Sequence, residues 1–226
     1  PAVVDELVSQ LDLTASFLHL AGVEQPDYYQ GKVLNALLPK GEQHAPYEYL
    51  YTASDNFDDV IECFRAVHNN RYTYIRNYFP ELPYDQAQMY MDLHRPSLHI
   101  LRKLNAAGEL NAEQSLFMAQ TKPVEELYDY IADPHCLNNL AEDPQYAAEL
   151  ELMRGYMADW LSKNRDNGLE DRESRELSDS YKEENRLRYY LKNYQPQVWA
   201  DICDGIIFDE YDHYKRLMKQ QKQSKR

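Results

Sequence analysis

The sequence predicts an α+β fold, in which a small antiparallel sheet of about four strands is packed by one long helix, with additional helices around it. Four short runs are rich in Tyr, Val, Ile and Phe, which are residue types favoured in strands. A later segment repeats apolar residues at spacings of three and four, the pattern of an amphipathic helix. Because that helix must bury its apolar stripe, we expect it to pack on the sheet.

The predicted strands are residues 47–51, 62–68, 72–77 and 126–130. Only a few residues, among them Asn69 and Asn70, separate the second strand from the third. Asparagine tolerates the left-handed backbone that a type I′ turn requires, so these two strands are expected to form a hairpin with a two-residue loop.

A short helix is predicted within residues 8–23, with Asp12 as its N-cap and Gly22 as the residue just past its end. Residues 24–46 carry several prolines and glycines and predict a connecting loop. Residues 83–120 are rich in helix-forming residues and predict two or three short helices, interrupted at Pro96 and Gly108.

The strongest predicted helix follows Asp143 and Pro144, an N-cap residue and a proline suited to the first helical position, and should end near Asn164. Its apolar stripe consists of Tyr146, Leu150, Met153, Met157, Trp160 and Leu161.

Charge and hydropathy exclude some classes of function. The chain has 24 basic and 38 acidic residues, a net charge of −14, which repels nucleic acids and anionic membrane surfaces. It contains no apolar run long enough for a membrane span. Its three cysteines, Cys63, Cys136 and Cys203, do not have the spacing of a zinc site. Their number allows one disulfide.

The densest group of acidic residues near a predicted strand consists of Asp55, Asp58, Asp59 and Glu62. Its carboxylates suit hydrogen bonds to sugar hydroxyls or a divalent cation, although a solvated loop is the commoner setting for such a group. It lacks the order of residues that an EF-hand loop requires. The histidines are scattered and predict no metal site.

Three arginines, Arg65, Arg71 and Arg76, recur along the predicted hairpin. Arginine binds a sulfate or a carboxylate with two parallel hydrogen bonds, so these residues either meet an anionic ligand or pair with the acids of the chain. Cys63 lies inside a predicted strand, which favours a buried structural thiol over a reactive one.

Three blocks, in order, resemble the sulfatase family, especially sulfatases of polysaccharides and heparan N-sulfatases. The first is VSQLDLTASFLHLAGV with the following QGKVL, the second is RAVHNNRYTYIRNYFPELPYDQ, and the third is PVEELYDYIADPHCLNNLAEDPQY continuing through Trp160. Together they cover about residues 8 to 170. Asp55 and Asp58 also match the family, whereas Ser54 and Asn56 stand where arginines are common.

The resemblance implies a parent enzyme, a sulfuric ester hydrolase with an alkaline-phosphatase-like N-terminal domain that holds a formylglycine residue, Ca²⁺ and the catalytic Lys and His. The chain has no Cys or Ser followed by x-Pro-x-Arg, the pattern from which formylglycine arises. It is therefore expected to be a fragment that lacks the nucleophile and is inactive alone, an expectation that its first residue, a proline, also favours. Its implied partners are the missing N-terminal catalytic domain and a sulfated carbohydrate.

On this interpretation the chain shapes the substrate cleft, and its candidate substrate-binding residues are Asp55, Asp58, Asp59 and Arg65. No catalytic or metal-binding residue of the family can be placed on it. Family resemblance suggests a periplasmic, secreted or lysosomal enzyme. The alternative is a non-catalytic module that binds a glycan or another protein.

The expected domain organisation has three parts. Residues 1–46 correspond to the end of the large sulfatase domain and a connector, and residues 47–165 to the α+β subdomain that ends the family's fold. Residues 166–226 are expected to form a charged arm followed by a helical extension.

Overall fold

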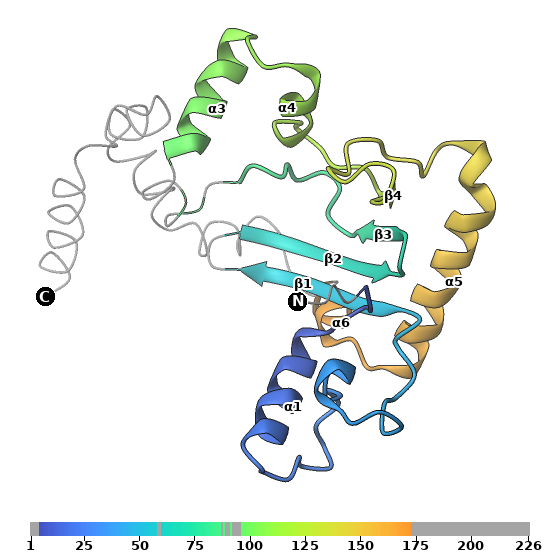
Figure 1. Ribbon diagram of the computed structural model, residues 1–226. Coiled ribbons are helices and arrows are strands. Elements are labelled where there is room, and N and C mark those ends of the chain that lie inside the picture. The colour runs from blue at the N-terminus through green and yellow to red at the C-terminus, as the bar shows by residue number, and fades with distance from the viewer. Residues whose placement is uncertain (1–4, 58–59, 87, 89–90, 92–95, 173–226) are drawn as a thin grey trace, which may run out of the picture. The chain divides into compact units, whose positions relative to one another are not determined.

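The computed structural model describes residues 5–57, 60–86, 88, 91 and 96–172 (Figure 1). Asp58, Asp59, His94 and most of the expected arm and extension lie outside this part of the chain. The elements, in chain order, are α1 (Gln10–Leu20), η1 (Asn35–Leu37), β1 (Leu50–Phe57), β2 (Val60–His68), β3 (Tyr72–Asn77), α3 (Pro96–Ala107), α4 (Ala112–Phe117), β4 (Glu125–Asp129), η2 (Pro144–Tyr146), α5 (Ala147–Lys163) and α6 (Asn167–Arg172).

The chain divides into two compact units. Unit 1 contains Pro1–Ala53, Arg65–Arg76 and Glu125–Asn164. Unit 2 contains Ser54–Phe64, Asn77–Val124 and the described residues from Arg165 onward.

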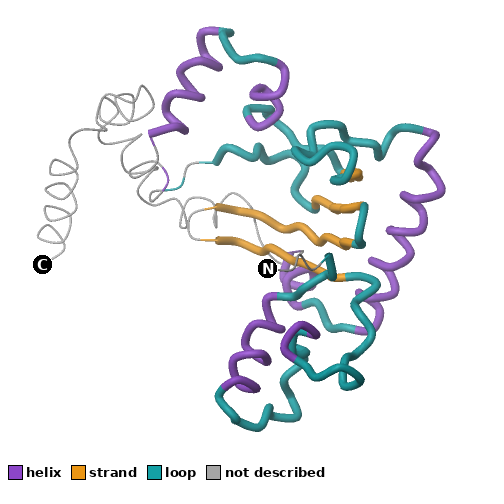
Figure 2. The backbone as a smooth tube through the Cα atoms, viewed as in Figure 1, coloured by secondary structure: helices purple, strands orange, loops and turns teal. Residues whose placement is uncertain are grey.

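The expected four-stranded antiparallel sheet is confirmed, with the strands in the order β1-β2-β3-β4 (Figure 2). β3 and β4 pair antiparallel, with Tyr72 opposite Asp129 and Arg76 opposite Glu125. Strands that follow one another in sequence are therefore neighbours in space, although the helices α3 and α4 lie between β3 and β4 along the chain.

The first strand was expected at residues 47–51, and this position is wrong: β1 runs from Leu50 to Phe57. Its last six residues, TASDNF, have little strand propensity, and a solvated loop was the commoner setting expected for the acidic group that includes Asp55. β1 is an edge strand, so one of its sides faces water and its position is set by backbone pairing with β2 more than by side-chain burial. Asp55 consequently lies in a strand.

The turn between β2 and β3 also differs from the expected type I′ turn. Among the described residues other than glycine, Cys136 alone has a positive φ, so neither Asn69 nor Asn70 adopts the left-handed backbone. Instead, the Asn69 side-chain oxygen accepts hydrogen bonds from the backbone N–H groups of Arg71, at 2.8 Å, and Tyr72, at 2.6 Å. The side chain closes the turn without left-handed residues.

α1 begins one turn earlier than expected, because its N-cap is Ser9 and not Asp12. The two residues form a capping box, in which Ser9 N–H donates to the Asp12 carboxylate at 2.8 Å. Gly22 follows the helix with a φ of +66°, as expected for the residue that terminates it.

The core of unit 1 lies between the sheet and α5, as the apolar stripe predicts. Leu150, Met153 and Met157 of α5 pack against Val67, Tyr74 and Leu127 of three strands. Two aromatic pairs extend this contact: Tyr49 with Tyr156, and Tyr51 with Trp160, whose rings stack 5.1 Å apart. The expected end near Asn164 is confirmed, since Asn164 is the C-cap of α5. Its start differs, because Asp143 caps the short turn η2.

Unit 2 contains α3 and α4, which confirms two of the short helices expected between residues 83 and 120. Gly108 ends α3 with a φ of +69°, a conformation that strains residues with a Cβ. A second core contains Ile61, Cys63 and Phe79. Cys63 is buried there, as expected.

None of the helices in the described residues has the length and apolar composition needed to cross a membrane.

Candidate functional site

Two ion pairs join separate segments of unit 2: Glu62 with Lys122, and Asp85 with Arg102. We call these four residues, together with Tyr84, the polar cluster. Glu62 comes from β2, Tyr84 and Asp85 from the loop after β3, Arg102 from α3, and Lys122 from the segment before β4. The two pairs are connected along the chain, because Tyr84, whose ring faces Lys122, is followed directly by Asp85, which pairs with Arg102.

The first pair is buried. The Lys122 side chain is 0% exposed, and its Nζ lies 2.5 Å from Oε2 of Glu62 and 5.6 Å from the centre of the Tyr84 ring. The backbone N–H of Lys122 also donates to the Pro80 carbonyl at 2.8 Å. A buried ammonium group is tolerated only with such partners, so the pair fixes where the chain enters β4.

The second pair is bidentate. Nε of Arg102 lies 2.7 Å from Oδ2 of Asp85, and Nη2 lies 2.6 Å from Oδ1. Two parallel hydrogen bonds between planar groups fix orientation as well as distance, so α3 is tied to the loop after β3. Next to Asp85, the buried side chain of Gln86 bonds both the N–H and the carbonyl of Ile61, at 3.2 and 2.8 Å.

The contacts of the polar cluster hold the loop after β3 in place. Both of its cations pair with carboxylates of the same unit. Contacts of this kind, between a cationic donor and a carboxylate acceptor, fix the position of the segments that they join.

The predicted substrate-binding residues have different settings. Asp55 is exposed on the edge strand β1, whereas the Arg65 residue is 1% exposed within β2. Asp58 and Asp59 lie outside the described residues. Asp55 and Arg65 belong to different compact units, so the sheet alone does not define a common site for them. Their role in substrate binding stays a prediction.

The hairpin arginines Arg71 and Arg76 pair with acids of the chain, which was one of the two expectations for these residues. Nη2 of Arg71 lies 2.7 Å from Oδ2 of Asp129, and Nη1 of Arg76 lies 3.7 Å from Oε2 of Glu125. The first contact holds the pKa of Asp129 below its ordinary value, mainly through the hydrogen bond from Arg71.

Glu125 is bonded by side chains from two further elements. It accepts hydrogen bonds from the Tyr74 hydroxyl at 2.6 Å and from Nε and Nη2 of Arg154 at 2.8 and 2.6 Å. The Arg154 hydrogen bonds are the main reason that the pKa of Glu125 is lowered to about 2. Glu125 therefore joins β4, β3 and α5 as a permanently ionised anchor at neutral pH.

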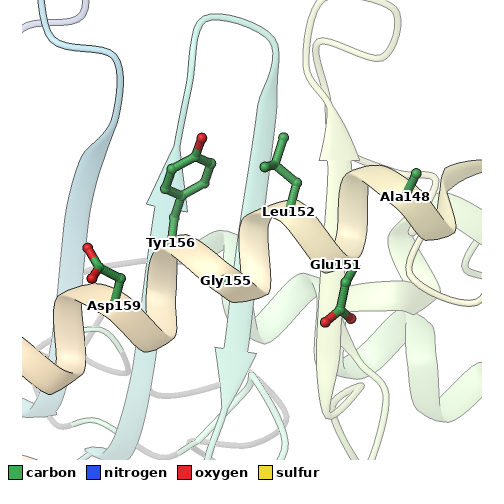
Figure 3. Close-up of a pocket in the computed structure, with 6 residues that line it drawn as sticks. All are labelled: Ala148, Glu151, Leu152, Gly155, Tyr156 and Asp159. Carbon is green, nitrogen blue, oxygen red and sulfur yellow. The ribbon is translucent and has the colours of Figure 1, made fainter.

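An open depression of about 610 Å³ lies along α5 and is lined by Ala148, Glu151, Leu152, Gly155, Tyr156 and Asp159. Figure 3 shows Leu152 and Tyr156 projecting from the same side of the helix, with Gly155 between them. The charged residues of this lining are two carboxylates, which repel a sulfated ligand. The depression is therefore a poor site for an anionic sugar.

Within the described residues, no group of three or more His, Cys, Asp or Glu side chains is arranged to hold a metal ion.

Comparison with known proteins identifies the relationship. Residues 1–97 match the family described as N-sulphoglucosamine sulphohydrolase, C-terminal. The chain is 34% identical, over 157 residues, to an ulvan-active sulfatase of Formosa agariphila, and the matched part is 70% of this chain and 26% of that protein. It is 26% identical over 173 residues to the human N-sulphoglucosamine sulphohydrolase, which corresponds to 73% of this chain and 34% of the relative.

The chain belongs to the sulfatase family and matches a family model of its C-terminal region. It spans about a quarter to a third of the length of the relatives that it matches. Among solved structures, a 2-O GAG sulfatase is similar, with a TM-score of 0.48, 23% identity, and coverage of 77% of this chain and 28% of the other.

Sequence reasoning missed most of the polar cluster of this sulfatase region. Glu62 was named in the acidic group, but its partner Lys122 is 60 residues away in sequence. No local spacing rule connects residues so far apart. One signal did exist, because Tyr84 and Asp85 lie in the PYDQ end of the second block that resembles sulfatases.

Proposed function

We propose that the chain is the C-terminal part of a sulfatase whose parent hydrolyses sulfate esters of a carbohydrate. The observation that carries this proposal is the 34% identity to an ulvan-active sulfatase, which extends over 70% of this chain. The similarity to a human N-sulphoglucosamine sulphohydrolase supports the same substrate class, a sulfated sugar.

The reactive centre belongs to the remainder of the parent, by family resemblance a formylglycine residue with Ca²⁺. We propose that the described residues of this chain support that centre. Their contribution is structural: the two ion pairs of the polar cluster and the Glu125 anchor hold the sheet and its loops in one arrangement. Catalysis of this kind depends on such positioning of the substrate.

Within this function, the proposed substrate-binding residues are Asp55, Asp58 and Asp59, which contact the sugar, and Arg65, which supports them. A sugar ring presents many hydroxyl donors, and ionised carboxylates are acceptors for them. The exposure of Asp55 supports this role. Buried Arg65 suits a supporting role behind the surface, since its residue is 1% exposed.

The test compares the chain alone with the protein encoded by its natural gene, extended upstream of Pro1. Both are assayed against an aryl sulfate and a sulfated polysaccharide. We expect turnover only from the longer protein, and turnover by the chain alone would contradict the assignment of the chemistry to the remainder. An upstream sequence without a Cys/Ser-x-Pro-x-Arg pattern would favour the alternative, a non-catalytic interaction module.

A further inference from the structure

The described residues that line the depression on α5 all lie on one side of that helix. They repeat at intervals of three and four, from Ala148 to Asp159, and such residues are neighbours on a helix surface. The volume of about 610 Å³ is within the range of sites that bind small ligands. These residues belong to unit 1, so the depression is a feature of one compact unit.

The depression is apolar in the middle and has hydrogen-bond acceptors towards its ends. Leu152 is 45% exposed, and Tyr156 is half-buried. Gly155 lies between them, and a Cβ there would meet no atom within 4 Å, so the missing side chain leaves this space open (Figure 3). Glu151 and Asp159 lie four residues before and after Gly155. A sugar ring matches this pattern, because it combines apolar C–H groups with hydroxyl donors.

The ring of Tyr156 is held in position by the protein itself. Its centre lies 3.7 Å from the centre of the Tyr49 ring, at an interplanar angle of 31°. The helix is held in turn by two hydrogen bonds from Arg154 to Glu125, at 2.8 and 2.6 Å. A sugar that lies against Tyr156 therefore binds without the main entropic cost of ordering that side chain.

The two carboxylates of the depression have cationic partners on α5. Nη1 of Arg154 lies 3.4 Å from Oε2 of Glu151, and Nζ of Lys163 lies 2.6 Å from Oδ2 of Asp159. Because each pair carries no net charge, the surface favours an uncharged ligand over a cationic one. Carboxylate oxygens accept hydrogen bonds from hydroxyl groups, whereas a sulfate group presents acceptor oxygens and would meet acceptors here.

A second copy of α5 fits this surface poorly. A two-fold axis through Gly155 would place Glu151 opposite Asp159 of the second copy, because these residues lie four positions on either side of the axis. That contact would bring two carboxylates together at each end, and no hydrogen bond forms between ionised carboxylates. The symmetric contact that most homodimers use is therefore unfavourable at this surface.

We propose that the depression on α5 is a secondary binding site for uncharged sugar units of the polysaccharide on which the parent sulfatase acts. This proposal rests on the proposed function, which supplies a carbohydrate chain as the substrate. The site holds a stretch of the polymer that carries no sulfate, and it thereby raises the concentration of the remaining chain near the enzyme. It contributes to binding and takes no part in the chemistry.

The first test measures sugar binding to the full chain of residues 1–226 by NMR. The probes are uncharged oligosaccharides of β-linked glucose, xylose and mannose, and a sulfated oligosaccharide of glucose. We expect at least one uncharged probe to shift the backbone amide signals around Gly155, with a Kd of about 1 mM or below, and the sulfated probe to bind more weakly. The proposal is overturned if none of the uncharged probes shifts these signals, or if the sulfated probe binds as tightly.

Gly155→Leu is the variant that fills the depression, since the added side chain enters open space and leucine suits a helix. Ala158→Leu is its control, because Ala158 is exposed on the same helix and lies outside the lining. We expect Gly155→Leu to weaken binding of the uncharged probe about tenfold or more, and Ala158→Leu to change it less than about twofold. Neither variant should lower the melting temperature. Equal losses of binding in the two variants would overturn the proposal.

Two further outcomes would assign the depression to another occupant and overturn the proposal. One is that a lysine-rich peptide binds there more tightly than the uncharged sugars and is displaced by Gly155→Leu, which indicates a cationic protein partner. The other is that the chain forms a dimer in sedimentation experiments and that Gly155→Leu dissociates it, which indicates a second copy.

Kinetics of the longer protein separate this site from the proposed function. Gly155→Leu should raise KM for a sulfated polysaccharide about threefold or more, and leave kcat and the KM for a small aryl sulfate unchanged. If the longer protein turns over neither substrate while the chain binds the uncharged probe at α5, the sugar site stands and the sulfatase activity fails. If turnover is normal while Gly155→Leu changes neither binding nor KM, the activity stands and the sugar site fails.

Discussion

Glu125 shows how one side chain ties several elements together. It lies on β4, accepts a hydrogen bond from Tyr74 on β3, and forms two with Arg154 on α5. Each of these bonds involves a charged group, and such bonds are among the stronger ones in proteins. The attachment of α5 to the sheet therefore includes a polar contact at its edge as well as the apolar core.

The pKa of Glu125 leads to a prediction about pH. The folded protein holds this pKa at about 2, below the ordinary value of 4.5, so the unfolded chain takes up the proton more readily. The stabilisation is present above about pH 5 and declines as the pH falls towards 2. We expect Glu125→Gln to lower the free energy of unfolding by about 1 to 3 kcal/mol at pH 7, and by progressively less at lower pH, in urea titrations.

Glu151→Gln is the matched control, because Glu151 also contacts Arg154, at 3.4 Å, but its side chain is 77% exposed. An exposed pair of this kind contributes little, so we expect a change below about 0.5 kcal/mol. Equal losses in the two variants, or a loss at Glu125 that does not depend on pH, would contradict the anchoring role.

The buried Lys122 gives a second prediction for single residues. Lys122→Met removes the partner of the Glu62 carboxylate and should destabilise the protein by about 3 to 5 kcal/mol. The double variant Glu62→Gln with Lys122→Met removes both charges and should recover most of that loss, to within about 2 kcal/mol of the unsubstituted protein. Urea unfolding of the two single variants and the double variant measures the coupling. Additive losses would show that the ion pair is not the cause.

Gly155 and Gly31 differ in the space that is available for a side chain. A Cβ added at Gly155, on the exposed side of α5, would meet no atom within 4 Å. Gly155→Ala should therefore stabilise α5 by about 0.5 to 1 kcal/mol, because alanine has less backbone freedom to lose. Gly31→Ala is the contrasting change, since its Cβ would clash with the Leu11 carbonyl group. We expect a lower melting temperature for Gly31→Ala and a higher one for Gly155→Ala.

At the level of elements, patterns that repeat along the sequence predicted the structure well. The stripe of α5 was predictable because the spacing of Leu150, Met153 and Met157 itself reports which side is buried. The cap of α1 was misplaced by one turn, since Ser9 and Asp12 are both good N-cap residues and a capping box uses both. β1 was misplaced because an edge strand is set by its neighbour and leaves only a weak trace in its own composition.

At the level of the whole molecule, the family could be predicted, but its interactions could not. Short blocks of sequence carry the resemblance to sulfatases. Ion pairs such as Glu62 with Lys122 and Glu125 with Arg154 join residues 60 and 29 positions apart, and no periodicity links them.

The proposed substrate role of Asp55 gives the last prediction, which concerns the complete enzyme. In the longer protein, Asp55→Asn should raise KM for a sulfated oligosaccharide about fivefold, the effect of weakening one hydrogen bond of about 1 kcal/mol. KM for a small aryl sulfate, which has no sugar hydroxyls, should not change. Asp27→Asn, at another exposed aspartate, is the control and should leave both values unchanged. An equal rise in KM for both substrates would show that Asp55 acts on the shape of the protein and does not contact the sugar.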